Sequence, residues 1–431
     1  MTGGLSSAAR LVAAAAVVVV GVGVAAARHG SSGPLPLTPS LAATRYAAIE
    51  RVLTARGQAI VHHDRHAFLA TVDPRNRVFR RSQARMFTDL ARVPLRSWSY
   101  AMTARGRALP ADAAAYDAPV WAPRVFTLGY RLADFDRRPT SLRQYPTFVD
   151  RHGRWYLASL SDYTADGLVS ATDLWDYGPV AVVRRPDVLV LGPPSQRQTM
   201  RVVAGDVQLA IPQVSSVWGR GWSRRAVVLL PRTQREMALI DEDHEDLAGI
   251  AALTSAEVRT AAGHPSPVGD RITINPANWH QLSPLGQQVV LRHELTHVAS
   301  EAATGTHTPT WLIEGLADYV GYRFADVPVT VAAAELQRVV RGGRLPGRLP
   351  PDRAFRGAAA QLAVSYEQAW FVCRTIAQRF GVAKLVAFYR AVGASMRPPG
   401  QAVRRAVVAV LHLRLASLVA LWRAEMLAAL R

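Results

Sequence analysis

The string His293-Glu294-Leu295-Thr296-His297 places two imidazoles and one carboxylate within five residues. On a helix, residues i and i+4 lie about 40° apart in projection, so both histidines face one side, whereas Glu294 lies about 100° from His293. Imidazoles at this spacing are typical zinc ligands, and a glutamate that flanks the metal is suited to act as a general base. The string alone also arises by chance, so the elements around it decide its meaning.

Two helix starts surround this string. Ser283-Pro284 combines a capping hydroxyl with a proline at the first helical position, and Gly305 marks the end of that helix. A second start follows at Thr308-Pro309. The first helix has a buried face made of apolar residues: Val289, Val290, Leu291, Leu295 and Val298.

The second predicted helix carries Glu314 and Asp318 at positions i and i+4. If a tight turn joins the two helices, Glu314 completes a site with three ligands and one open position for water. Asp318, one turn further on, is placed to accept the free N–H of a ligating histidine, for which His293 is the best candidate. The alternative is that both acids are ordinary solvated residues.

These motifs, HELTHV and WLIEGLADY, resemble those of the gluzincin metallopeptidases of the thermolysin-like clan, in particular the peptidase MA-like group. The resemblance implies that His293, His297 and Glu314 bind Zn²⁺, that Glu294 is the catalytic base, and that Asp318 supports a ligand. Sixteen residues separate His297 from Glu314, slightly fewer than in thermolysin, so the turn between the helices must be shorter.

The motifs of other zinc-enzyme classes do not match this part of the sequence. A metzincin would need glycine at position 300 and histidine at position 303, where the chain has Ser300 and Ala303. His307 falls in the turn with no motif behind it, and is not expected to be a ligand. The Gly-Ala-Met-Glu-Asn string of gluzincin aminopeptidases is absent, which argues against an exopeptidase of that kind.

The family also implies a donor for the reaction's oxyanion from a later helix, and Tyr366 is the candidate, with simple packing as the alternative. Substrate backbone is expected to pair with a sheet edge. Residues 247–254 are the predicted edge strand, with 225–231 and 271–276 as inner strands, although 247–254 would also suit a plain core strand.

The N-terminal half has a different pattern of predicted helices and strands. Residues 43–72 read as helix, and the histidines of 62–66 within it have no further ligand spaced to complete a second metal site. Runs suited to strands follow, at Ser97–Met102, Trp121–Leu132, Thr147–Asp150 and Trp155–Ser159, with a hairpin turn at 150–154. This pattern resembles the cone of the nuclear-transport-factor-2-like family, for which no catalytic residue is expected.

Three other segments have plain interpretations. The acidic run 241–246 lacks the spacing of a calcium loop and is expected to be solvated. The run 341–348 is expected to form a basic loop near the active site, whose arginines meet acidic substrate groups. Residues 418–430 are expected to form an amphipathic helix that closes the core.

Composition places the chain in a cellular context. Its 431 residues carry a formal net charge of +19, and Lys384 is the only lysine beside fifty arginines, a bias typical of a high-GC bacterium. A basic surface attracts anionic envelope polymers, and no nucleic-acid-binding motif accompanies the charge.

An apolar run from Leu11 to Ala27 follows Arg10 and predicts export, either as a cleaved signal peptide or as a retained membrane anchor. The lone Cys373 cannot form an internal disulfide.

The sequence therefore predicts an α+β protein. Residues 1–30 form the leader or anchor, 31–42 a linker, 43–170 the nuclear-transport-factor-2-like domain, 171–200 linker strands and 201–431 the gluzincin domain, with a mixed sheet and a helical C-terminal half. The expected function is a zinc-dependent metalloendopeptidase acting on peptides or proteins outside the cytoplasmic membrane. The alternative is a catalytically silent envelope-binding module that uses the pocket of the N-terminal cone.

Overall fold

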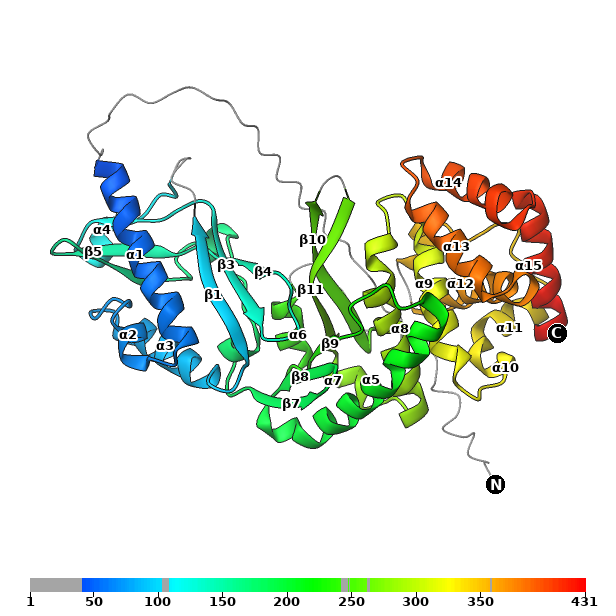
Figure 1. The fold of residues 1–431 in the computed structure, drawn as a ribbon, viewed down its shortest axis with the longest axis horizontal. Helices are drawn as coiled ribbons and strands as arrows, with labels where there is room; N and C mark the ends of the chain where they lie inside the picture. The colour runs from blue at the N-terminus through cyan, green and yellow to red at the C-terminus, as the bar shows by residue number, and fades with distance from the viewer. Residues whose placement is uncertain (1–40, 103–107, 242–246, 248, 262–263, 357–358) are drawn as a thin grey trace.

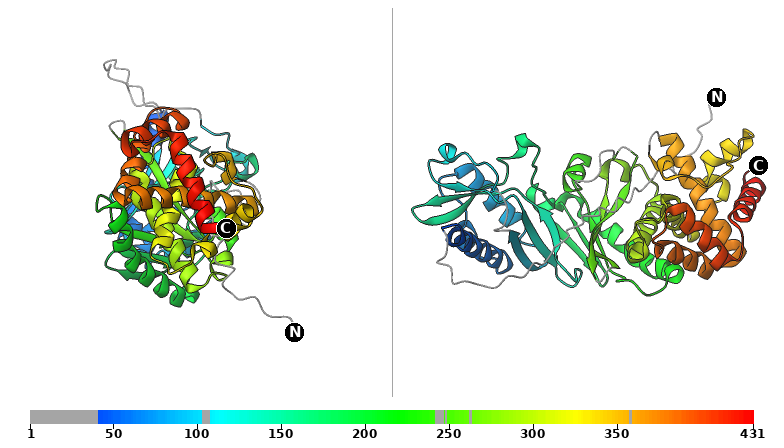
Figure 2. Two further views of the ribbon diagram at one scale, coloured as in Figure 1. Left: turned by 90° about the vertical axis from the view of Figure 1, so that its right-hand side faces the viewer. Right: turned by 90° about the horizontal axis from the view of Figure 1, so that it is seen from above.

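The computed structural model describes residues 41–431 except 103–107, 242–246, 248, 262–263 and 357–358. The predicted leader of residues 1–30 and nearly all of the predicted linker lie outside this range. The chain forms a mixed α+β structure with a helical C-terminal half, as expected. A small α+β part lies at one end, a five-stranded sheet in the middle and the helices at the other end (Figure 1; Figure 2, right).

The N-terminal part places four helices beside two antiparallel sheets. Its helices are α1 (Leu41–Val61), α2 (Arg65–Leu69), α3 (Arg77–Asp89) and the short α4 (Ala113–Tyr116). One sheet has the order β1 (Leu95–Met102), β3 (Phe126–Leu132), β4 (Thr140–Arg143), and the other β2 (Val120–Trp121), β5 (Thr147–Arg151), β6 (Arg154–Ser159).

Local chemistry explains where these elements break. The helix expected over residues 43–72 is interrupted at His63, whose φ is 57°, and Asp64 then caps α2 by accepting a hydrogen bond from the amide of Ala67 at 2.9 Å. The expected hairpin turn is present, because His152 and Gly153 both have positive φ, the backbone that a two-residue hairpin requires.

The interior of the N-terminal part is filled by side chains. Arg56 and the indole N–H of Trp98 both donate to the hydroxyl of Tyr100, each at 2.8 Å. The cavity that these residues help to line has a volume of about 20 Å³. That space suits one or two water molecules and no larger ligand.

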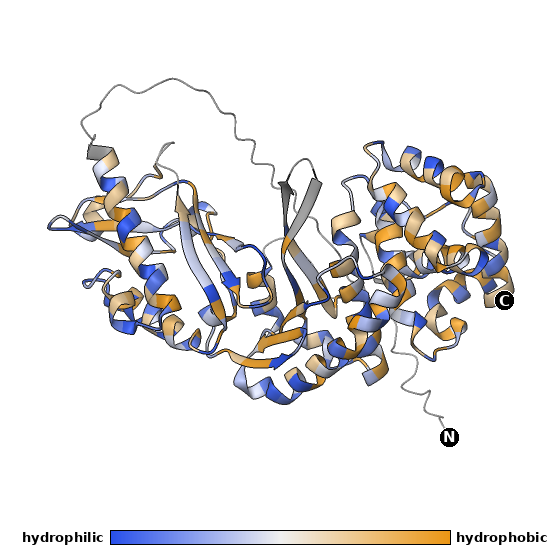
Figure 3. Cartoon of the chain, in the orientation of Figure 1, coloured by the Kyte–Doolittle hydropathy of each residue, from blue (hydrophilic) through white to orange (hydrophobic). Residues whose placement is uncertain are grey.

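The central sheet has the order β10-β11-β9-β8-β7, with β8, β9 and β11 parallel and the outer strands antiparallel. Its strands are β7 (Ala181–Arg185), β8 (Val188–Gly192), β9 (Ala226–Leu229), β10 (Ala252–Ala261) and β11 (His264–Ile274). These strands are largely hydrophobic in the centre of the sheet (Figure 3). Such strands are expected where both faces of a sheet are covered.

Both faces of the sheet are buried at its central strands β8 and β9. Val188 and Val190 pack with α5 (Arg197–Trp218), whereas the alternating Leu189 and Leu191 pack against the N-terminal part. Residues 171–200, which the sequence assigned to linker strands, thus supply two strands of the sheet that the two halves of the molecule share.

The edge strand of the sheet is β10, which begins at Ala252 and not at residue 247 as the sequence predicted. The side-chain amide of Asn275 donates to the carbonyl oxygens of Leu247 and Ile250 at 3.0 and 2.8 Å, and these bonds hold the preceding segment in a turn. The predicted inner strands contain β9 and the end of β11.

The helical half packs against the sheet through α8, which contacts β10 and β11. Its main helices are α8 (Pro284–Ser300), α9 (Thr310–Arg323), α12 (Ala359–Phe380), α13 (Val382–Gly393) and α15 (Leu415–Leu430). Shorter ones are α6 (Gln234–Ile240), α7 (Pro276–Trp279), α10 (Val329–Ala332), α11 (Ala334–Arg341), α14 (Pro399–Ala406) and a π-helical turn (Val407–Leu411). The expected C-terminal helix is α15, whose buried residues Leu418, Trp422 and Met426 join the main core.

Within the described part of the chain, no single helix has the length and hydropathy to cross a membrane. The segments Pro399–Leu411 and Leu415–Leu430 meet this test only as a pair, with a bend of 79° between them.

Candidate metal centre

Helix α8 carries both histidines into the protein interior. Ser283 caps the helix by accepting a hydrogen bond from the amide of Gly286 at 3.1 Å, and Pro284 occupies its first turn, as the sequence predicted. His293 and His297 are only 2% and 4% exposed. Imidazoles buried to this extent need polar partners, and the neighbouring helix provides them.

Helix α9 positions Glu314 because small residues let it approach its neighbours closely. A β-carbon on Gly315 would lie 2.4 Å from the carbonyl oxygen of Ala369 in α12, and one on Gly321 would lie 3.0 Å from that of Val289 in α8. Glycine at these two positions therefore allows α9 to lie directly between α8 and α12. The glutamate is presented from a helix that is fixed on both sides.

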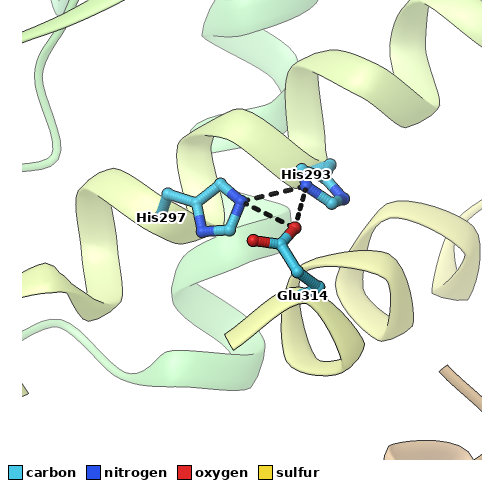
Figure 4. Close-up of side chains that lie close together, drawn as sticks. All are labelled: His293, His297 and Glu314. Atoms are coloured by element: carbon cyan, nitrogen blue, oxygen red, sulfur yellow. Dashed lines mark hydrogen bonds and ion pairs between the residues drawn. The ribbon is translucent and has the colours of Figure 1, made fainter. Parts of the chain in front are cut away.

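The three predicted ligands converge on one point (Figure 4). The Nε2 atoms of His293 and His297 lie 2.9 Å apart, and Oε2 of Glu314 lies 3.3 Å from the first and 3.6 Å from the second. Zinc bonds of about 2.0–2.1 Å in tetrahedral geometry set ligand atoms about 3.3–3.4 Å apart. The observed separations bracket this value, so the donor set fits a zinc ion in both chemistry and spacing.

Asp318 orients the first histidine. Its Oδ1 atom lies 2.8 Å from Nδ1 of His293, the contact that the sequence predicted. When Nδ1–H donates to this carboxylate, the lone pair of Nε2 points to the common centre. Burial disfavours a charged imidazole, but the carboxylates of Asp318 and Glu314 outweigh burial and raise the pKa of His293 well above its usual value.

The charge of the cluster also calls for a cation. Glu294, Glu314 and Asp318 are all buried, against two imidazoles that are neutral when they bind metal. Among the described residues, no hydrogen-bond donor reaches Oε1 of Glu294 or Oε2 of Glu314. Unpaired buried carboxylate oxygens are costly, and a divalent ion with one open coordination position would satisfy them.

Glu294 is held by a residue that the motifs do not contain. The hydroxyl of Thr254, on the edge strand β10, donates to Oε2 of Glu294 at 2.7 Å and lies 3.1 Å from its carbonyl oxygen. This contact fixes one carboxylate oxygen and leaves Oε1 for chemistry. Burial raises the pKa of Glu294 against the opposing charges of the two histidines, which makes the carboxylate a stronger proton acceptor.

Tyr366 lies in the second turn of α12 and is buried. Burial raises the pKa of its hydroxyl well above the usual value, and so do the charges of Glu314, Asp318 and Glu294 and a hydrogen bond to the Glu314 side chain. Its ring packs edge-on against Phe355 at 5.3 Å. The structure thus brings a protonated phenol next to the third ligand.

Other sequence candidates lie elsewhere. His307 is in the turn before α9 and outside the converging set. His62 and His63 are exposed in the turn between α1 and α2, and His66 is exposed on α2. Within the described part of the chain, the two histidines and Glu314 are the only cluster with metal-ligand spacing. Most of the acidic run 241–246 lies outside the described residues.

No family model and no curated protein matches this sequence. Among solved structures, it is similar to a yeast LTA4 hydrolase, with 11% identity and a TM-score of 0.35 over 63% of this chain and 42% of the other. It is also similar to an M1 zinc metallopeptidase from Deinococcus radiodurans, with 17% identity and a TM-score of 0.31 over 64% and 57% of the two chains. A mutant of that peptidase bound to a Tyr-Ser-Ala substrate gives 16% identity and a TM-score of 0.33 over 64% and 58%.

The chain therefore spans between 42% and 58% of the length of these structures. At such TM-scores the similarity is distant, and the chemistry has to be judged from the metal centre itself. The comparisons give no support to the resemblance of residues 43–170 to the nuclear-transport-factor-2-like family.

Proposed function

We propose that this protein is a zinc-dependent metalloendopeptidase of the gluzincin type. The observation that carries the proposal is the convergence of His293, His297 and Glu314 beside a buried Glu294 that is held by Thr254. A purely structural zinc site has no use for an oriented carboxylate next to the metal, whereas hydrolysis requires one.

Each residue then has a distinct task. Zinc, when bound by the two histidines and Glu314, supplies a positive charge that lowers the pKa of water and polarises a carbonyl group. Glu294 takes the proton of the attacking water and later gives it to the leaving amine. Tyr366 donates a hydrogen bond to the oxyanion of the tetrahedral intermediate, and Asp318 keeps His293 in the ligating tautomer.

The edge strand β10 is our candidate for binding the substrate backbone. It lies beside α8, and Thr254 on it contacts the catalytic base. An extended peptide that pairs with this edge would be presented to Glu294 at fixed register. Pairing of this kind suits internal peptide bonds, and the absent aminopeptidase string favours an endopeptidase.

We further propose that the enzyme acts outside the cytoplasmic membrane, either secreted or anchored. The apolar run from Leu11 to Ala27 supports export. The alternative of a silent module that binds a ligand in the N-terminal cone has less support, because the cavity inside that part measures only about 20 Å³.

The test is hydrolysis of an unstructured, casein-like protein by the purified chain, with and without a chelator. We expect cleavage that chelator abolishes and added zinc restores. Glu294→Gln should keep stoichiometric zinc and lose turnover, while the exposed Glu50→Gln in α1 serves as a matched control with full activity. Bound zinc with no hydrolysis of any peptide library would refute the peptidase assignment, and an active Glu294→Gln variant would refute the assigned base.

A further inference from the structure

A cavity much larger than the one inside the N-terminal part lies between that part and the central sheet, and none of the metal-site residues lines it. Its volume is about 810 Å³, within the range typical of ligand sites. It is built by β1, β3 and the turn after β3, the β7–β8 turn, α5 and the segment before β9. Its charged lining residues are Arg96, Arg131, Arg137, Arg224, Arg225, Asp134, Asp136 and Asp187.

The aspartates of this cavity already interact with side chains that do not line it. The carboxylate of Asp136 is bound in bidentate fashion by the buried Arg271, at 2.9 and 2.8 Å, and that of Asp134 pairs with Arg184 at 2.6 Å. Neither Arg271 nor Arg184 lines the cavity. Asp187 accepts a hydrogen bond from the side chain of Gln208 at 3.2 Å. The charges of Asp136 and Asp134 are therefore paired with arginines outside the lining, whereas Asp187 has only a neutral amide as its partner and keeps its charge.

The arginines of the lining, in contrast, keep free donors. The guanidinium groups of Arg96, Arg137 and Arg224 form no hydrogen bond or ion pair with any residue that the structure describes. Arg131 and Arg225 donate to the backbone oxygens of Asp136 and Asp134, which leaves part of each guanidinium free. Five guanidinium groups from separate segments thus surround one polar space.

We propose that this arginine-lined cavity binds an anion that carries more than one phosphate group. Guanidinium groups bind phosphate oxygens through paired N–H donors, and several of them at one site favour a multivalent anion over a single charge. Five arginines of the lining outnumber its one aspartate without a cationic partner, Asp187, so net positive charge remains, and the volume exceeds that needed for one inorganic phosphate. The site is separate from the metal centre and does not depend on the peptidase assignment.

The test is calorimetric titration of the full chain with inorganic tripolyphosphate. The triple variant Arg96→Gln, Arg137→Gln, Arg224→Gln should bind at least about tenfold more weakly than the unmodified chain. A matched control removes three exposed arginines far along the chain, Arg404→Gln, Arg405→Gln and Arg414→Gln, and should change affinity less than about twofold. Equal thermal unfolding midpoints of the two triple variants establish that both remain folded.

Vesicles identify the source of the phosphate. Binding to phosphatidylcholine vesicles that requires added cardiolipin, whose headgroup carries two phosphates, and that the cavity substitutions abolish, would assign the phosphates to lipid headgroups. Tripolyphosphate binding without vesicle binding would assign them to a soluble or polymeric phosphate. The proposal is overturned if the unmodified chain binds neither probe, or if the control substitutions weaken binding as much as the cavity substitutions.

Discussion

Substitution of Asp318 should weaken zinc binding in graded steps. Its Oδ1 lies 2.8 Å from Nδ1 of His293, and its side chain is only 12% exposed, so solvent screens the contact little. Asp318→Asn keeps an acceptor oxygen and removes the charge, and we expect about a tenfold loss of zinc affinity, or about 1.4 kcal/mol. Asp318→Ala removes the contact as well, and we expect about a hundredfold loss, or about 2.7 kcal/mol.

Competition with a chromophoric zinc chelator at fixed pH measures these affinities. The control is Asp326→Asn, an exposed aspartate shortly after α9, which should leave the zinc affinity unchanged. If Asp318→Ala binds zinc within about a factor of three of the unmodified chain, the carboxylate does not orient His293 and this part of the reasoning fails.

Three further predictions concern catalysis and stability. Thr254→Val should lower kcat about tenfold with KM and zinc content unchanged, because the hydroxyl of Thr254 holds Glu294. Thr254→Ser should restore the rate, and a Thr254→Val variant with full kcat would contradict this role. Tyr366→Phe should lower kcat about a hundredfold in steady-state assays while the unfolding midpoint stays the same, and an unchanged kcat would leave Tyr366 with packing alone. Burial raises the pKa of Glu367 to about 8, although two backbone amides of α11 oppose the shift. The folded chain therefore keeps a proton that the unfolded chain loses near pH 4, so this group's contribution to stability is complete below that pH and is lost as pH rises through 8. Denaturant unfolding from pH 5 to 8 should show that decline, and Glu367→Gln should remove its share; a variant with the same pH dependence as the unmodified chain would contradict the shift.

The metal ligands could be predicted because their signal is local. Two helix starts and two pairs of residues at i and i+4 place His293, His297, Glu314 and Asp318 on facing sides of adjacent helices. Because the turn between the helices is short, few other arrangements of these four side chains are possible. The structure brings these four residues together with the spacing that such helices imply.

Contacts over long sequence distances could not be predicted in this way. Thr254 lies 40 residues before Glu294, and nothing in its neighbourhood distinguishes it from any threonine in a strand. The close approach of Gly315 to Ala369 joins two helices whose packing no local pattern specifies. Both contacts depend on the tertiary arrangement of sheet and helices.

The interpretation of residues 171–200 missed a signal that was present. The apolar run from Val188 to Leu191 does not alternate with polar residues, which is typical of a strand covered on both faces. A linker strand would be covered on at most one side. The run therefore already pointed to a sheet shared by the two halves of the molecule.

Crystals grown with zinc and measured at the zinc absorption edge test the central claim most directly. We predict a single strong anomalous peak about 2.0–2.2 Å from Nε2 of His293, Nε2 of His297 and a carboxylate oxygen of Glu314. The absence of a peak there, or a Glu314 side chain that points away from a zinc ion held by the histidines alone, would contradict the assigned metal centre.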